Sequence, residues 1–312
     1  MGDSVKTPGR NRTAAMLGEA ALLAATFPLA VLPLPVLTWL GAALGRLVFL
    51  LWPRRRAIAA ANLEQAAAGN SLVLPWPPRE TARRSFENLG RGGAEDLKLF
   101  HRLDESLLRQ VRIEGVEHLR EAKARDKGLI MITGHCGNWE LLGVAVAVLL
   151  GESFSVVARE QNSAVLNRLI ERMRTRSGNE VIYKNGAVRK LLAQIRAKRG
   201  VGILIDQAVL ENEGLVVDFL GRPALTTKLP ALIARKTGAP VLPCFIHRDE
   251  KNGGNVITFH RPPVLSDNPD PEQAVREDTA RFTSYVEAFV REHPDQWLWG
   301  HRRWKRAGGD PA

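Results

Sequence analysis

The sequence predicts an α/β protein with a mostly parallel central sheet flanked by helices, preceded by apolar N-terminal helices that associate with a membrane. Three observations support this fold class. Short apolar runs alternate with helical stretches in the later part of the chain, which is typical of parallel sheets. The 312 residues are 45% hydrophobic, enough for a sizeable core. Residues 20–45 carry no charge and are long enough for a membrane helix.

The N-terminal apolar segment predicts two helices, because Pro28, Pro33 and Pro35 interrupt it. The second helix is expected over about residues 35–52, since proline suits a first helical turn and another proline follows. The apolar region is long and ends in a basic cluster, unlike a cleaved secretory signal, so we expect it to be retained. Basic residues on both flanks leave its orientation open. A pair of buried hairpin helices in a soluble protein is the alternative.

After residue 54 the pattern is first helical and then alternating. A proline-rich break over residues 75–78 precedes a helix over residues 85–100. Four short apolar runs then predict strands at residues 128–133, 202–205, 239–246 and 254–259. We therefore expect flexible termini over residues 1–15 and 306–312, membrane-associated helices over residues 16–53, and a single domain over residues 54–305.

The charge balance indicates an anionic partner. Lys and Arg number 44 against 33 Asp and Glu, for a net charge of +11. Nucleic acid, anionic lipid and an acidic carrier protein all fit this charge. The two cysteines, Cys136 and Cys244, have no disulfide-framework or zinc-ligand spacing, and they fit a reducing cytosol. The chain has no HExxH, Walker or GxGxxG pattern, so no metal, nucleotide or other cofactor is expected.

The clearest candidate site lies where the strand ending at Thr133 gives way to an apolar helix. His135 follows this strand, and ligands gather at the carboxyl ends of strands in open α/β sheets. Asn138 is expected to cap the helix and Glu140 to lie in its first turn, where an ionised carboxylate is favoured. A neutral imidazole beside a carboxylate can accept a proton from a hydroxyl. Of the seven histidines only His135 has an acid five residues later. Cys136 is assigned to packing.

Two further residues are candidates for the site. Arg174 lies on a helical stretch with several other arginines, and a solvated basic face is expected for most of them; that the Arg174 guanidinium pairs with Glu140 or a lipid phosphate is implied by the family resemblance described below. Asp206 follows a predicted strand, so it should face the same sheet edge and could organise Arg174 or the acceptor. An ordinary aspartate that caps a turn is the alternative interpretation of Asp206.

The C-terminal segment interleaves tryptophans with basic residues. Trp297, Trp299 and Trp304 alternate with His301, Arg302, Arg303 and Lys305. This composition suits a membrane interface, where aromatic rings lie at the headgroups and cations meet phosphates. Stacking on nucleic-acid bases is a second interpretation. At least one of these tryptophans is expected to pack in the core.

The segment Gly-His-Cys-Gly-Asn-Trp-Glu-Leu-Leu-Gly at residues 134–143 resembles the first sequence block of the lysophospholipid acyltransferase superfamily, in particular its lipid A biosynthesis branch. The resemblance covers nearly the whole chain. Further matches occur in the expected order around Leu34, Gly41, Arg56, Asn62, Arg159, Asn162, Arg174, Asp206, Gln207, Phe219 and the segment 294–305. One departure is Phe219-Leu220, where the family often has two phenylalanines, and we expect it to alter the lining of an acyl pocket.

The resemblance implies a glycerol-3-phosphate acyltransferase-like fold and an acyltransferase domain over residues 54–305. It implies direct attack of an acceptor hydroxyl on an acyl thioester carried by acyl carrier protein, without a covalent acyl-enzyme. The acceptor would be a lipid A precursor, an anionic glycolipid, reached at the cytoplasmic face of the inner membrane, and no nucleic acid would be bound. His135 and Glu140 would be catalytic. Substrate binding would fall to Arg174, Asp206, Arg159, Asn138 and Gln207.

Two alternatives remain open at this point. The same chemistry could act on another lipid acceptor, such as a phosphoglycerolipid, an ornithine lipid or a mannosylated lipid. The chain could instead be a non-catalytic protein that binds lipid or nucleic acid, with an incidental His135. The coincidence of one His/Glu pair with Arg174 and Asp206 argues against that second alternative.

Overall fold

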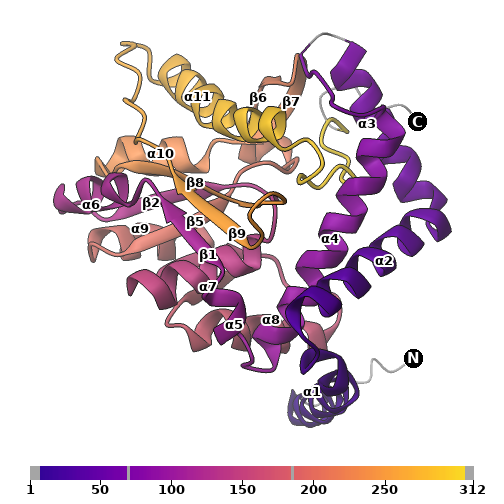
Figure 1. The fold of residues 1–312 in the computed structure, drawn as a ribbon. Helices are drawn as coiled ribbons and strands as arrows, with labels where there is room; N and C mark the ends of the chain where they lie inside the picture. Colours follow the sequence, from indigo (N-terminus) through magenta and orange to yellow (C-terminus); the bar gives the residue numbers. More distant parts are fainter. Residues whose placement is uncertain (1–7, 69–70, 184–185, 306–312) are drawn as a thin grey trace, which may run out of the picture.

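The computed structural model describes residues 8–68, 71–183 and 186–305 (Figure 1). Residues 1–7 and 306–312, which belong to the expected flexible termini, lie outside the described residues. The first helix begins at Pro8. The helices are α1 (Pro8–Ala30), α2 (Leu34–Leu51), α3 (Pro53–Ala68), α4 (Pro78–Phe100), α5 (Glu105–Leu108), α6 (Val116–Ala124), α7 (Trp139–Leu150), α8 (Ala164–Arg176), α9 (Ala187–Arg196), α10 (Leu229–Thr237) and α11 (Pro271–Glu292).

The strands form one large sheet and one hairpin. They are β1 (Val111–Glu114), β2 (Leu129–Thr133), β3 (Phe154–Ala158), β4 (Glu180–Tyr183), β5 (Gly200–Leu204), β6 (Gly214–Phe219), β7 (Arg222–Thr227), β8 (Val241–Arg248) and β9 (Asn255–Phe259). The seven-stranded sheet has the order β1-β9-β8-β2-β5-β3-β4, and β6 and β7 form the hairpin. All neighbours in the large sheet are parallel except β8 and β9. The predicted α/β fold with a mostly parallel sheet is confirmed.

The central strands are buried on both faces, as parallel sheets require. Ile130 and Ile132 of β2 pack into one apolar cluster with α9, α10 and α11, whereas Leu129 and Met131 pack into a second cluster with α5, α6, α7 and α8. This alternation follows the two-residue period of a strand. Figure 1 shows α11 on one side of the sheet and α7 on the other.

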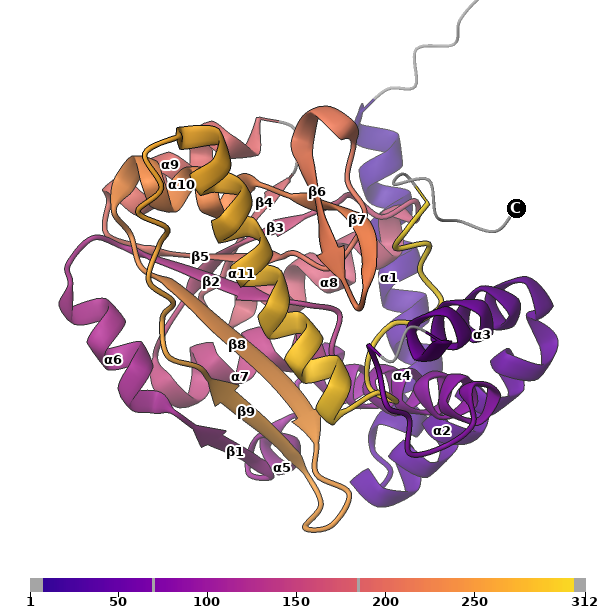
Figure 2. The same cartoon turned by 90° about the horizontal axis from the view of Figure 1, so that it is seen from above.

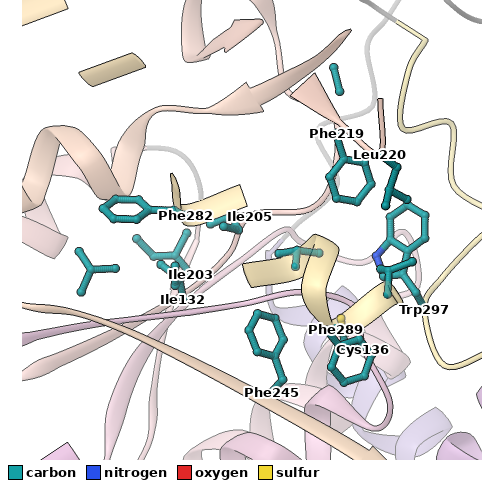
Figure 3. Close-up of a cluster of buried hydrophobic side chains, with 14 of the residues drawn as sticks. Ile132, Cys136, Ile203, Ile205, Phe219, Leu220, Phe245, Phe282, Phe289 and Trp297 are labelled. Atoms are coloured by element: carbon teal, nitrogen blue, oxygen red, sulfur yellow. The ribbon is translucent and has the colours of Figure 1, made fainter. Parts of the chain in front are cut away.

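The first cluster extends beyond the sheet to the hairpin and the C-terminal segment. Figure 3 shows Ile132 and Ile203 of the sheet beside Phe282 of α11, and Phe219 of the hairpin beside Trp297. Phe219 and Trp297 have ring centroids 5.4 Å apart. The core therefore connects the C-terminal segment with the strands that precede the candidate site.

The two expected N-terminal helices are confirmed, and both are long and apolar enough to cross a membrane by length and composition. α1 continues through Pro28, and the break comes at Pro33. α2 crosses α4 closely: a β-carbon added at Gly41 would lie 2.4 Å from the carbonyl oxygen of Gly90, so only glycine fits there. Figure 2 shows α1, α2, α3 and α4 together on the flank where the chain leaves β2 and β5.

Candidate active site

His135 and Asp206 are brought together by two adjacent parallel strands. β2 and β5 are paired with Thr133 opposite Leu204, so the residues that follow them leave the same carboxyl edge of the sheet. His135 Nδ1 lies 2.8 Å from Asp206 Oδ1, and the backbone N–H of His135 donates to Asp206 Oδ2 at 2.8 Å. Asp206 is 2% exposed. The predicted strand-end position of both residues is confirmed.

The charge state of Asp206 determines that Nδ1 of the His135 ring carries a proton. Burial by itself raises the pKa of Asp206, but the neighbouring His135 ring, its two hydrogen bonds and one from Trp297 outweigh burial and hold the pKa below its ordinary range. An ionised carboxylate only accepts hydrogen bonds, so Nδ1 of His135 carries a proton, and in the neutral ring Nε2 then has the lone pair. The Gln207 amide nitrogen lies 3.0 Å from Nε2. A neutral imidazole in this tautomer can act as a general base.

Glu140 lies in the first turn of α7 as predicted, but the carboxylate beside the His135 ring is not Glu140, contrary to the expectation. Arg174 of α8 donates to both carboxylate oxygens, from Nε at 2.9 Å and from Nη2 at 2.6 Å. The carboxylate bonded to the His135 ring is Asp206 and not Glu140, because the paired strands bring Asp206 beside the ring whereas the start of α7 directs Glu140 to α8. The predicted Arg174–Glu140 pair is present, as a two-bond fork.

Asn138 caps α7 as predicted, since its Oδ1 accepts from the N–H of Leu141 at 3.0 Å. Its amide nitrogen donates to Glu95 Oε2 at 3.0 Å and to Asp96 Oδ1 at 3.2 Å, both on α4. Desolvation, and then the nearby Glu140 carboxylate, raise the pKa of Asp96 well above its usual value. The Asn138 side chain therefore joins α7 to α4 with all its polar atoms.

Arg159 and Cys136 have different surroundings. Arg159 follows β3, which lies next to β5, and it is exposed at the same edge of the sheet. Cys136 is fully buried in the core, in agreement with its assignment to packing, and burial raises the pKa of its thiol. Within the described ranges, no group of three or more His, Cys, Asp or Glu side chains is placed to hold a metal ion.

An apolar cavity of about 490 Å³ opens at His135. Helices α2 and α4 and the C-terminal segment enclose it. Its lining includes Leu44 and Val48 of α2, Trp52 just after that helix, Phe86 and Leu89 of α4, and Trp139, Trp297, Leu298, Trp299 and His301. A cavity of this size with few polar groups is typical of small-molecule sites, and its lining suits a hydrocarbon chain.

The C-terminal segment holds the His135 loop, a role that the sequence did not reveal. Gly137 N–H donates to the carbonyl of Gln296 at 2.7 Å, and Leu298 N–H donates to the carbonyl of His135 at 3.2 Å. Trp297, between them, donates from its indole N–H to Asp206 Oδ2 at 2.8 Å. The two segments therefore pair like short antiparallel strands around Cys136 and Trp297.

The expectation of a C-terminal membrane interface is wrong. Trp297, Trp299 and Trp304 are 2%, 0% and 1% exposed, and Arg303 is fully buried. Arg303 donates to the Leu225 carbonyl at 2.7 Å, and burial lowers its pKa to about 10. The alternating aromatic and basic residues therefore belong to a buried segment, in which Arg303 donates a hydrogen bond to a backbone carbonyl of β7.

The expected effect of Phe219-Leu220 on an acyl pocket also needs correction. Both side chains are buried, at 0% and 1% exposure, and neither belongs to the cavity lining. They lie beside Trp297 in the core (Figure 3). Leu220 takes a left-handed conformation, with φ of 53°, in the turn of the β6–β7 hairpin. This departure from the family pattern therefore affects packing of the hairpin.

The chain is similar in sequence to known acyltransferases. The sequence profile of bacterial lipid A biosynthesis acyltransferases matches residues 8–306. The chain is 26% identical over 287 residues to the lipid A biosynthesis lauroyltransferase of Escherichia coli K12, covering 90% of this chain and 89% of the relative. It is 25% identical to the palmitoleoyltransferase of the same organism, covering 88% and 86%. It is also 28% identical to the phosphatidylinositol mannoside acyltransferase of Mycobacterium tuberculosis CDC 1551, covering 77% of each chain.

Proposed function

This chain belongs to the bacterial lipid A biosynthesis acyltransferase family and is a lipid O-acyltransferase, and we propose that it transfers a fatty acyl chain from an acyl carrier protein thioester to a hydroxyl of a lipid A precursor. The observation that carries the proposal is the His135–Asp206 pair at the mouth of an apolar cavity of about 490 Å³. The cavity would hold the acyl chain and the imidazole would activate the acceptor.

In the proposed mechanism the acceptor hydroxyl gives its proton to Nε2 of His135 while its oxygen bonds to the thioester carbon. The carbon–sulfur bond then breaks, and the imidazolium returns the proton to the leaving thiolate. Asp206 stabilises the imidazolium and keeps the required tautomer. The Gln207 amide, 3.0 Å from Nε2, marks the place that the acceptor hydroxyl would take. No covalent acyl-enzyme is needed.

Trp297 is a positioning residue in this proposal, because it acts through Asp206. The carboxylate accepts from the His135 backbone and from the Trp297 indole on Oδ2, which leaves Oδ1 for the ring nitrogen. Three donors on one carboxylate fix its plane, and therefore the direction of the imidazole. The same indole lines the cavity. Trp297 thus connects the acyl site with the orientation of the base.

Glu140 and Arg174 form the second part of the proposed site. The two-bond fork holds the guanidinium in one orientation, with 22% of the Arg174 side chain and 14% of the Glu140 side chain exposed. A fixed arginine suits a phosphate group of the acceptor. Glu140 would then contribute to catalysis by holding Arg174. Arg159, exposed one strand further along the edge, is proposed to contact the same headgroup.

A lipid A precursor is preferred as acceptor because the family profile covers residues 8–306 and two relatives named for lipid A biosynthesis match about nine-tenths of the chain. A mannosylated lipid is the second candidate, since a phosphatidylinositol mannoside acyltransferase is 28% identical. The proposed location is the cytoplasmic face of the inner membrane, where thioester donors are available.

The test uses the purified protein in mixed micelles with isotope-labelled acyl groups. The donor is either acyl carrier protein thioester or coenzyme A thioester, and the acceptor is either a lipid A precursor or a phosphatidylinositol mannoside. Mass spectrometry of the extracted lipid identifies the product. We expect transfer from the carrier protein to the lipid A precursor. Transfer to the mannoside alone would assign the second acceptor, and transfer to neither would refute both.

A further inference from the structure

Helix α1 packs along much of its length against the rest of the protein. Glu19, only 3% exposed, accepts hydrogen bonds from Arg168 and Arg172 of α8, the first at 3.0 Å from Nε. Gly18 lies against Val165, where an added β-carbon would come within 2.7 Å of a methyl group. These contacts join the first half of α1 to the helix that carries Arg174.

The second half of α1 is joined to the end of α4. Thr26 Oγ1 lies 2.9 Å from His101 Nε2. The ammonium group of Lys98 donates to the carbonyls of Ala30 and Leu32 at 2.8 Å each. Contacts with α8 and α4 thus follow the helix from residue 18 to residue 30, roughly 18 Å at 1.5 Å per residue.

This docking is incompatible with a helix that crosses a bilayer. The hydrocarbon core is about 30 Å thick, and charged side chains within it are rare and paired in the bundle interior. If α1 stood upright in that core, Arg168 and Arg172 of α8 would be carried to the same depth, and their side chains are 30% and 56% exposed. A position in the plane of the membrane surface leaves both arginines outside the hydrocarbon.

Helix α2 is constrained in the same way by its close crossing with α4. The Gly41 and Gly45 backbones touch those of Gly90 and Phe86, so the two helices share one level. α4 is a charged helix, with ion pairs between Arg83 and both Glu80 and Glu87. An upright α2 would carry these charges into hydrocarbon.

The outward faces of the two helices are nevertheless apolar. We call this surface the apolar face, and it comprises Met16, Leu17, Phe27, Leu29, Val36, Trp39, Leu44, Leu47, Leu50 and Leu51, each at least 44% exposed. Figure 1 shows α1 and α2 on the same outer edge of the molecule, at the lower right. Arg46, with 62% of its side chain exposed, lies on α2 among these residues. Arginine beside exposed tryptophan is typical of a membrane–water interface.

We propose that α1 and α2 lie in the plane of one leaflet of an anionic phospholipid bilayer, with the apolar face in its acyl region, and that neither helix crosses the membrane. Amphipathic helices bound in this way insert only part of their diameter. The docking of α1 on α8 then fixes the height of the active site above the leaflet.

The route of the lipid follows from the same arrangement, and this step rests on the proposed function. Leu44 of the apolar face also lines the cavity at His135, together with Val48 of α2 and Trp52 at its end. The cavity therefore borders the apolar face at Leu44. An acyl chain can pass from the leaflet to His135 beside α2 without crossing water.

The test measures depth along α1. The chain's own cysteines, Cys136 and Cys244, are buried, so introduced cysteines can be labelled selectively. Ala14, Ala21 and Pro28 are exposed and seven residues apart, hence on one face of the helix. Single Ala14→Cys, Ala21→Cys and Pro28→Cys variants of the full chain carry a fluorophore and bind vesicles of phosphatidylethanolamine and phosphatidylglycerol. Lipids with a quencher near the headgroup or near the chain end then report depth.

An in-plane helix predicts that all three labels are quenched more by the shallow lipid and to a similar extent. A spanning helix predicts that Ala21 is quenched most by the deep lipid and that the two end labels are shallow, which would overturn the proposal. Val73→Cys is the control, because Val73 is 84% exposed in the connection between α3 and α4, and it should not be quenched.

A second measurement tests the apolar face without probes. Trp39→Glu combined with Leu47→Glu should lower partition into the same vesicles roughly tenfold or more, whereas Val73→Glu should not. Unchanged partition of the double variant would refute the assigned face. Acyl transfer to acceptor in detergent micelles is measured separately. If the labels on α1 are shallow but the protein transfers no acyl group, the proposed function is refuted and the in-plane position of α1 stands. If the label at residue 21 is deep and the protein is active, the in-plane position is refuted and the proposed function stands.

Discussion

A single substitution can test whether Trp297 positions Asp206. Trp297→Phe keeps a buried ring but removes the indole N–H that donates to Asp206 Oδ2 at 2.8 Å. A hydrogen bond to a charged group contributes about 1.5–3 kcal/mol, and about 1.4 kcal/mol corresponds to a tenfold rate change. Asp206 keeps its two bonds to His135, so only part of that energy is lost in the transition state. We expect kcat to fall about tenfold.

The matched control is Trp299→Phe. Its indole also donates a buried hydrogen bond, to the Pro294 carbonyl at 2.6 Å, and its ring also lines the cavity. Both variants therefore share changes in cavity shape and in KM for the acyl donor, and the difference in kcat isolates the bond to Asp206. The assay is steady-state acyl transfer, with urea unfolding to correct for stability. Equal kcat values for the two variants would refute the positioning role.

Three further predictions concern the charges around the site. Glu140→Gln should lower kcat by about 10², because Arg174 loses its carboxylate, and the double variant with Arg174→Ala should lose little more, as a double-mutant cycle of kcat would measure. The pKa of Asp96 is higher in the folded protein than in the unfolded chain, where it is near 4. Above pH 4 the unfolded chain therefore loses this proton more readily than the folded protein, which lowers the free energy of unfolding. Asp96→Asn should therefore stabilise the protein at pH 8 in urea unfolding, with the gain vanishing as pH falls toward 4, and no gain at pH 8 would contradict the assigned cause. Arg303→Glu should lower the free energy of unfolding by about 3–5 kcal/mol, because Arg303 is buried. Arg302→Glu, at a partly exposed position, should change it by less than about 0.5 kcal/mol. Similar effects of the two substitutions would contradict the burial of Arg303.

Local sequence patterns predict the strand and the helix cap that carry the site, because both depend on residues close together in the chain. The apolar run before His135 is a strand by its own composition, and Asn138 is a helix cap by its own side chain. Strands β1, β3 and β4 and the hairpin strands β6 and β7 were not predicted, since these segments of four to six residues alternate or mix polar and apolar side chains. Strands of this kind are defined by their neighbours in the sheet.

The partners of the charged residues could not be predicted from spacing. Glu140 is five residues from His135 in the chain, yet Asp206, 71 residues away, contacts the ring, because β2 and β5 are adjacent in the sheet. Composition does not distinguish a buried aromatic segment from an interfacial one, so the C-terminal tryptophans suggest a membrane surface that the structure does not have. The pairing of Trp297 with Cys136 and its bond to Asp206 place that segment at the site.

The most direct test of the account is the rate of acyl transfer by His135→Ala, measured with labelled acyl carrier protein thioester and a lipid acceptor after circular dichroism and urea unfolding have confirmed the fold. Loss of a general base typically costs 10²–10⁴ in rate, so we expect kcat to fall by a factor on the order of 10² or more. Asp206→Asn should lower kcat in the same assay, because the imidazole loses its charged partner. A folded His135→Ala protein that transfers acyl groups at nearly the parent rate would contradict the proposed mechanism.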